Sequence, residues 1–214
     1  MDVFLAGVRR TSQPSPARNP GGDCFACALK SALDFLVPEH GRSAEEVWHI
    51  FDAETVGGGV ATNNTWPGMQ EALDTARFEW ELPIDWRIDL PLPLPDLENF
   101  SYCFGNMFNW EDYFYRLDAW LRAGYLALVE MRIPFSATGG LSADGKKLPN
   151  NHFALIDGVR RFWEPIGDIG RKLTHEVHFV DSSKHNVEWV PIDDAIVHFG
   201  IGALLLVRRD EVKN

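Results

Sequence analysis

The order of elements along the sequence predicts an α+β fold, with helices in the first part of the chain and a mostly antiparallel sheet in the second. Two observations lead to this prediction. Before residue 124, apolar residues recur every three or four positions in several segments, which is typical of amphipathic helices. After residue 124, short apolar runs alternate with turn residues, which is typical of strands.

The sequence divides into a short arm and one domain. Residues 1–22 contain three prolines and two adjacent glycines, so we expect an arm or loop there. Residues 23–214 are long enough to bury a single core. We expect this domain to have a helical half over 23–124 and a sheet half over 125–214.

Helix boundaries are marked by capping residues. Asp23 is a good N-cap for a helix over 24–36, and Pro38 ends it. Ser43 and Glu46 form a capping-box pattern before a second helix. Two more helices are expected near 67–77 and over 110–122, the latter closed by Gly124.

The later segments predict strands joined by short connections. Three prolines at alternate positions make 88–100 an extended connector before the sheet half. The strands and one short helix, over 191–198, follow from apolar runs and turn residues. The expected strands are 125–133, 152–162, 175–181, 187–190 and 202–209.

Charge and composition exclude several classes of function. The net charge of −11 would repel a phosphate backbone, so nucleic acid is not expected as a partner. No apolar run is long enough to span a membrane, and "MDVFLAGVRR" does not have the pattern of a signal peptide. Three cysteines are an odd number, which favours reduced thiols and a cytoplasmic location. The oligomeric state stays open.

Two cysteines, Cys24 and Cys27, fall in the first turns of the expected helix 24–36. The free N–H groups and the positive end of the dipole at a helix N-terminus stabilise a thiolate. The preceding "PGGD" can bring backbone N–H groups close to a developing oxyanion. Cys24 is therefore a candidate nucleophile.

A nucleophilic thiol needs a base and an orienting group. His152 opens a strongly apolar strand directly after a Gly-rich loop over 135–149, which places an imidazole at the end of the sheet. Asp181 ends the following strand. If these two strands are neighbours, the carboxylate can orient the imidazole, which gives a Cys24–His152–Asp181 triad.

These residues resemble the papain-like cysteine peptidase superfamily. The separation of 128 residues between Cys24 and His152 is close to the ~130–150 residues of papain-type enzymes. "DCFACALKSAL", "NHFALIDGV" and "HFVDSS" look most like the nucleophile helix, His strand and Asp strand of bacteriocin-leader (double-glycine) peptidases. The resemblance implies a papain-like fold with an N-terminal nucleophile helix and no cofactor.

The sequence departs from this pattern at two points. The papain signature around the cysteine would make Cys27 the nucleophile, but its glycine is replaced by Phe25 here. Arg18 stands where the family has its oxyanion-hole glutamine, and Asn19 is the best substitute donor. Trp66 and Trp110 are candidates to line a cleft.

The resemblance implies a cysteine peptidase or amidase acting on a peptide or protein through a thioester intermediate. Two alternatives stay open: an acyltransferase or transglutaminase-like enzyme with the same triad, and an inactive papain-like binding module. Each residue also has a structural interpretation. Cys24 and Cys27 could be small core residues, His152 could bond a turn, and Asp181 could form an Asx-turn. No metal site is expected, because Cys24-x-x-Cys27 has no second pair of ligands.

Overall fold

A computed structural model of the chain provides the structure. The structural statements below concern the residues that it describes, which are 2–12, 23–52, 70, 73–89, 110–133, 150–167, 170–181, 188–192 and 204–210.

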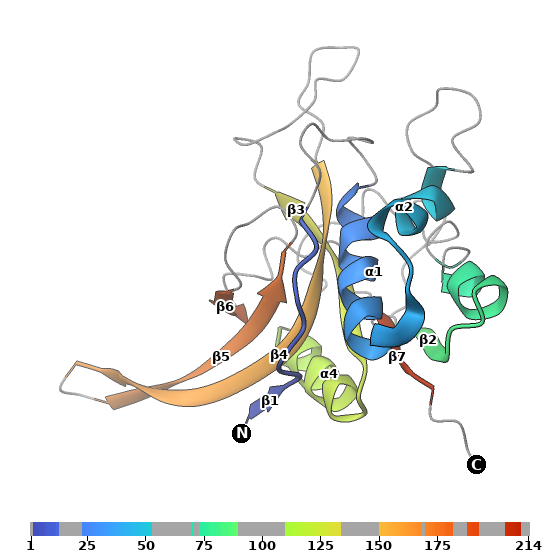
Figure 1. The fold of residues 1–214 in the computed structure, drawn as a ribbon. Coiled ribbons are helices and arrows are strands. Elements are labelled where there is room, and N and C mark those ends of the chain that lie inside the picture. Colours follow the sequence, from blue (N-terminus) through green and yellow to red (C-terminus); the bar gives the residue numbers. More distant parts are fainter. Residues whose placement is uncertain are drawn as a thin grey trace, which may run out of the picture.

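A seven-stranded antiparallel sheet forms the centre of the molecule (Figure 1). Its strands follow the order β2-β7-β3-β4-β5-β6, and β1 pairs with β4 beyond the end of β3. The fold is therefore α+β with a mostly antiparallel sheet, as the sequence predicts. The strands are β1 (Asp2–Phe4), β2 (Ile84–Asp89), β3 (Leu126–Ile133), β4 (Asn150–Ile166), β5 (Gly170–Val180), β6 (Glu188–Pro191) and β7 (Leu204–Arg209).

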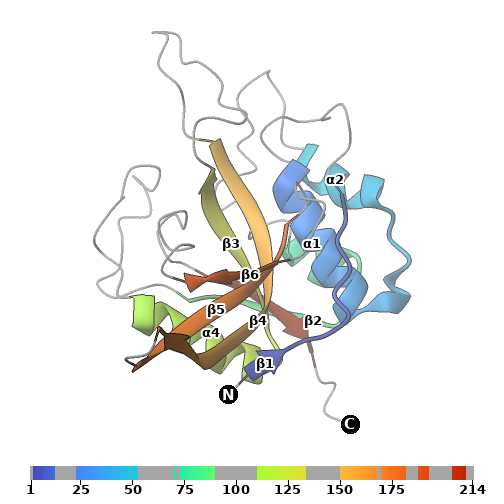
Figure 2. The same cartoon turned by 90° about the vertical axis from the view of Figure 1, so that its left-hand side faces the viewer.

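Helices cover both faces of this sheet (Figures 1 and 2). Side chains alternate between the faces along β3: Leu126 and Leu128 pack in the same core cluster as α1, and Ala127 and Val129 pack in the cluster that contains the buried face of α4. The helical elements are α1 (Asp23–Leu36), the 3₁₀ turn η1 (Pro38–His40), α2 (Ala44–Asp52), the π-helical segment Thr75–Glu79 and α4 (Trp110–Arg122).

Helix α1 is buried on nearly all sides, because the sheet covers one side and α2 packs on another. Phe25, Leu29 and Leu33 have no exposed surface. Three alanines, Ala26, Ala28 and Ala32, are also buried and let neighbouring elements approach closely. Such extensive burial is typical of a helix inside a core, and the charged residues Lys30 and Asp34 of α1 are less buried and bond each other.

The capping box ahead of α2 forms as predicted. The backbone N–H of Ser43 donates to Glu46 Oε2 at 2.8 Å, and the backbone N–H of Glu46 donates to Ser43 Oγ at 3.2 Å. Arg42 Nη1 donates to the same carboxylate at 2.9 Å. The first two contacts satisfy backbone donors that the helix terminus would otherwise leave open, and the Arg42 contact holds the Glu46 carboxylate in place.

Helix α4 has the predicted boundaries. Gly124 adopts φ 81°, the left-handed conformation that commonly follows a helix. Tyr113, Leu117 and Leu121 are buried against the sheet at helical spacing. The ring of Phe114 meets His175 of β5 at 4.6 Å between centroids, which fixes the helix over the centre of that strand.

Strands are not confined to the expected sheet half over 125–214, because β1 and β2 come from the first part of the chain and join the sheet. The arm over 1–22 therefore begins as a strand, and β2 takes the first two residues of the expected 88–100 connector. In the expected helix 67–77, the described residues are helical and continue as the π-helical segment to Glu79. Most of the expected 191–198 helix lies outside the described residues.

Strands β4 and β5 are longer than predicted and form a projecting hairpin (Figure 1). From Leu155 to Arg160, β4 has β3 or β1 on one side and β5 on the other, with the register shift at Asp157 between them. From Arg161 to Ile166, the partner of β4 among the described strands is β5. The hairpin thus leaves the body of the molecule as a two-stranded ribbon.

Candidate functional site

Cys24 is the second residue of α1, one position later than expected, because the helix begins at Asp23 rather than after it. Its thiol remains within the first turn, where backbone N–H groups are free of intrahelical partners. Cys24 is 6% exposed and belongs to the core cluster of α1. The thiol therefore lies at the edge of the core, with a small part of its surface open.

The start of β4 approaches the start of α1. The ring of Phe25, the residue after Cys24, meets the ring of Phe153 edge-on, with centroids 5.2 Å apart. Phe153 directly follows His152, whose backbone pairs with Met131 of β3. Figures 1 and 2 show the N-terminal ends of α1 and β4 at the same end of the molecule.

The strands that carry His152 and Asp181 are neighbours, which was the condition for a contact between them. Leu155 pairs with Val180, so Asp181 lies level with Ala154, two residues from His152. Positions related diagonally in this way are about 7–8 Å apart, which long side chains can bridge. Asp181 is buried, with 6% of its surface exposed.

Several predicted site residues lie outside the described part. These are Asn19, the loop 135–149, Trp66 and the side chains of His152 and Trp110.

Cys27 is fully buried one turn after Cys24. Its carbonyl accepts a hydrogen bond from Ser31 Oγ at 2.8 Å, and Ser31 Oγ in turn accepts one from the backbone N–H of Thr11 at 2.9 Å. The N-terminal segment is thereby held along α1. Full burial of Cys27 agrees with a core role.

A buried acid–imidazole pair, Asp157 with His178, was missed by the sequence analysis. Asp157 Oδ1 contacts His178 Nδ1, and both residues are buried. Burial raises the pKa of Asp157, and the contact with His178 only partly offsets this effect. The His178 ring contacts Phe4 and Trp189, with centroids 4.7 and 4.8 Å away, and these two rings also contact each other at 5.7 Å.

The local structure of β4 explains how this pair fits. The register shifts between Ile156 and Gly158, which indicates a bulge at Asp157. The carbonyl of Asp157 accepts a hydrogen bond from the backbone N–H of Leu5 at 2.9 Å. An acidic residue followed by glycine inside a strongly apolar strand was the sequence signal for this irregularity. The burial of both residues and the three-ring cluster of Phe4, His178 and Trp189 indicate a structural pair.

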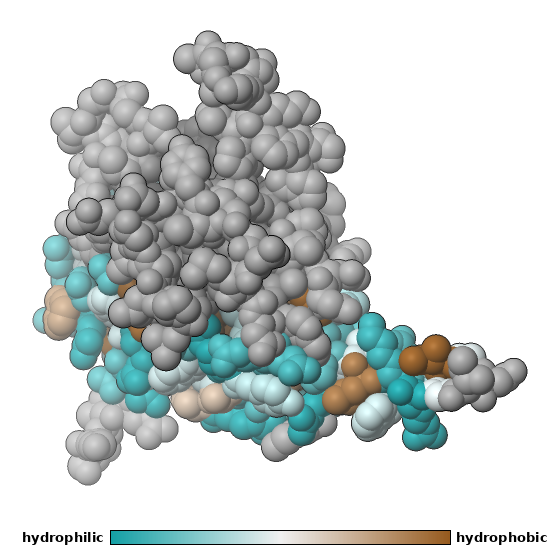
Figure 3. Space-filling model, turned by 180° about the vertical axis from the view of Figure 1, so that it is seen from behind, coloured by the Kyte–Doolittle hydropathy of each residue, from teal (hydrophilic) through white to brown (hydrophobic). Residues whose placement is uncertain are grey.

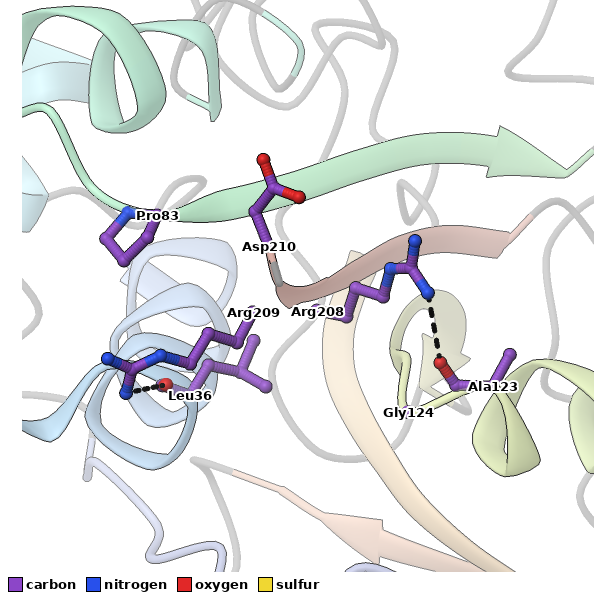
Figure 4. A pocket seen from close by; sticks show the side chains of 7 residues that line it. All are labelled: Leu36, Pro83, Ala123, Gly124, Arg208, Arg209 and Asp210. Carbon is purple, nitrogen blue, oxygen red and sulfur yellow. Dashed lines mark hydrogen bonds between the residues drawn. The ribbon is translucent and has the colours of Figure 1, made fainter. Parts of the chain in front are cut away.

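The described pocket lies at the other end of α1. Its volume is about 620 Å³, and Arg208 and Arg209 of β7 line it together with residues at the C-terminal ends of α1 and α4 (Figure 4). Arg209 Nη1 donates to the carbonyl of Leu36 at 3.3 Å, and Arg208 Nη1 donates to that of Ala123 at 3.5 Å. The two arginines thus bond the ends of two helices, and neither Cys24 nor Asp181 borders this pocket.

Comparison with protein-family models and with curated proteins gives no assignment. No family model matches the chain, and no curated protein matches it. Over the described ranges, there is no group of three or more His, Cys, Asp or Glu residues that could hold a metal ion. In the same part of the chain, no helix is both long and apolar enough to cross a membrane.

Proposed function

We propose that the protein is a papain-like cysteine hydrolase that cleaves a peptide or amide bond. The supporting observation is the Phe25–Phe153 contact at 5.2 Å, because these two residues directly follow Cys24 and His152 in the sequence. It joins the N-terminal end of α1 to the beginning of β4, as a thiol–imidazole pair would require.

In this proposal Cys24 is the nucleophile and His152 is the base. His152 takes the thiol proton, and the sulfur attacks the acyl carbon to give a tetrahedral oxyanion. The backbone N–H of Cys24 and the side chain of Asn19 stabilise that charge. The C–N bond then breaks, His152 donates its proton to the leaving amine, and a thioester remains. Water, deprotonated by His152, hydrolyses the thioester and restores the thiol.

Asp181 is a positioning residue in this scheme. Its position on the strand next to His152 suits a carboxylate that holds one imidazole tautomer. Because Asp181 is buried, it would act at low local dielectric, where its effect on the imidazole is strong.

The proposal makes one demand on the backbone. Phe153 and Leu155 pack on the α1 side of the sheet, whereas Ala154 and Ile156 pack on the α4 side. Regular alternation would assign position 152 to the α4 side, away from Cys24. In the structure β4 pairs regularly with β3 from Asn150 to Ile156, so a catalytic pair requires the first residues of β4 to leave this register.

Thiol alkylation tests the proposal directly. We expect iodoacetamide at pH 6 to label Cys24 faster than free cysteine, with the adduct located by peptide mass spectrometry. His152→Ala should slow this labelling to the free-thiol rate, and Cys27→Ser is the matched control that should leave it unchanged. Labelling of Cys24 no faster than free cysteine, or unaffected by His152→Ala, would falsify the catalytic pair.

A non-catalytic binding module is the second candidate, and the low exposure of Cys24 favours it. A buried cysteine in an apolar cluster often acts only as a small core residue. Cys24→Ala separates the two functions. If the protein is an enzyme, this substitution should abolish hydrolysis of a peptide library. If it is a binding module, the variant should keep its fold and still bind its ligand. Product analysis with an added amine acceptor distinguishes hydrolysis from acyl transfer.

A further inference from the structure

The projecting part of the β4–β5 hairpin exposes large apolar side chains. Trp163 is 61% exposed, Ile166 49% and Phe162 37%. Figure 3 shows apolar and polar residues together on the arm that extends from the body. A two-stranded ribbon is marginally stable in water by itself, so an arm of this kind gains stability from a surface that covers it.

The two faces of the arm differ in charge. Trp163 pairs with Leu173, and alternation from Val159 and Val177 places this pair on the α4 side of the ribbon. Pro165 and Arg171, which are paired, and Arg161 share that side. All charged residues described on it are therefore arginines. The opposite side has mixed charge: it carries Glu164 and Glu176, which engage Thr174 and Arg160, together with Lys172. Phe162 and Ile166 lie on this opposite side, so Trp163 is the large exposed apolar residue of the α4 side.

The outer surface of α4 has the complementary character. Glu111 and Asp112 are exposed in its first turn, and Tyr115 is 51% exposed one turn later. The Phe114–His175 contact joins α4 to β5 at the base of the projecting part of the ribbon, where His175 pairs with Arg161. The acidic, aromatic outer surface of α4 and the basic α4 side of the arm with Trp163 thus lie next to each other on the same face of the sheet.

We propose that this side of the molecule binds a second copy of the chain. In the dimer, the α4 side of each arm, with Trp163 and Arg171, packs on the outer surface of the partner's α4. Each chain contributes one arm and one α4, so a two-fold rotation forms two equivalent arm–α4 contacts. No arm or α4 surface is then left open to a third copy, and the assembly is a closed dimer. Trp163 is the apolar anchor of each contact, and the arginines face the acidic first turn of α4.

Charge favours a second copy over an anionic membrane. Arginine and tryptophan together also suit a lipid interface. The chain as a whole carries −11, however, which opposes approach to an anionic bilayer but leaves acidic surfaces available to a basic arm. The matching acidic and aromatic surface is present on the chain itself.

Sedimentation velocity of the full chain tests this proposal. We expect a monomer–dimer equilibrium in which Trp163→Ser raises the dimer Kd by about tenfold or more, as expected for an aromatic anchor. Ile166→Ser is the matched control, because Ile166 is on the other side of the same ribbon. It should leave the Kd within about twofold. Circular dichroism confirms that each variant keeps its fold.

Charge reversal provides an independent arm of the test. Arg171→Glu and the double variant Glu111→Lys/Asp112→Lys should each dimerise weakly, because like charges then face each other. In a mixture of the two proteins, every contact of the mixed dimer joins opposite charges. We expect dimers to reappear on mixing, and to weaken as salt is added.

The proposal is overturned by a protein that stays monomeric at every concentration, or by weak variants that do not recover on mixing. Equal effects of Trp163→Ser and Ile166→Ser would also overturn it. Flotation with phosphatidylserine–phosphatidylcholine vesicles tests the lipid alternative. Vesicle binding by a monomer that depends on Trp163 would assign the arm to a membrane instead.

Discussion

Alanine at position 158 should destabilise the protein, because Gly158 lies where three side chains approach the backbone of β4. A Cβ atom there would be 2.8 Å from Phe4 Cδ2, 3.1 Å from Trp189 Cη2 and 3.2 Å from His178 Cβ. Favourable contacts between carbon atoms are about 3.5–4.0 Å long. All three neighbours must therefore move to accept one methyl group.

Two opposing effects set the magnitude. Replacing glycine by alanine restricts the unfolded chain and stabilises a protein by about 0.4–1 kcal/mol where the site has room. Inserting a carbon into a packed site costs about 1–3 kcal/mol. Phe4 is 46% exposed and can shift, but His178 Cβ is attached directly to the backbone of β5. We therefore expect a net loss of about 1–2 kcal/mol in the free energy of unfolding.

Urea unfolding measures this loss, and Gly170→Ala is the matched control. Gly170 is also a strand residue of the same hairpin, but no atom lies within 4 Å of its added Cβ. Its substitution should be neutral or stabilising by up to about 1 kcal/mol. Phe4→Ala combined with Gly158→Ala should recover part of the loss. Equal stability of Gly158→Ala and Gly170→Ala would refute the close approach of these side chains.

Three further substitutions test individual contacts. Hydrogen bonds within the capping box lower the pKa of Glu46 to about 2, below its usual 4.5, so it stabilises the fold above pH 4.5 and loses this effect as the pH falls toward 2. Thermal unfolding should therefore show that the stability of Glu46→Gln varies less with pH in this window than the stability of the unchanged protein. Asp157→Ala leaves His178 Nδ1 without its buried partner and should cost about 1–3 kcal/mol in urea unfolding. Burial, together with the hydrogen bond to Asp85, raises the pKa of Tyr125 to about 12. In Tyr125→Phe, the tyrosinate absorbance change near that pH should disappear. Urea unfolding should show a loss of about 1.5–3 kcal/mol in the free energy of unfolding.

Locally encoded elements were predicted best. The capping box of α2, the boundaries of α4 and the glycine after it depend on contacts a few residues apart, so the local pattern was sufficient. The strands β3, β6 and β7 were found to within two residues because their apolar runs end at turn residues.

Elements that depend on distant partners were missed or shortened. β1 is three residues long and exists through its pairing with residues 158–160 of β4. β2 pairs with β7, which follows it by more than a hundred residues. The outer part of the hairpin is exposed and contains Pro165, Gly167 and Gly170, which are unfavourable in strands, so it carries no strong strand pattern. Short-range sequence patterns cannot predict these pairings, because the pairings depend on the assembled sheet.

The candidate site was accessible to sequence reasoning in part. The position of Cys24 near the start of a helix followed from Asp23, and the order of β4 and β5 followed from the strand pattern. The burial of Cys24 depends on the sheet and on α2, which pack on α1 from distant parts of the sequence. The Asp157–His178 pair needed the register of two strands and a bulge within it.

Arg208 and Arg209 have a consequence for how the molecule opens. Neighbouring residues on one strand bond the last carbonyls on opposite faces of the sheet, one at the end of α1 and the other just after α4. Fraying at either helix end would break the hydrogen bond between its last carbonyl and an arginine side chain of β7. This would loosen β7, which is bonded to the other helix end through the neighbouring arginine. Amide hydrogen exchange should therefore show α1 and α4 losing protection in a single cooperative event rather than as separate layers.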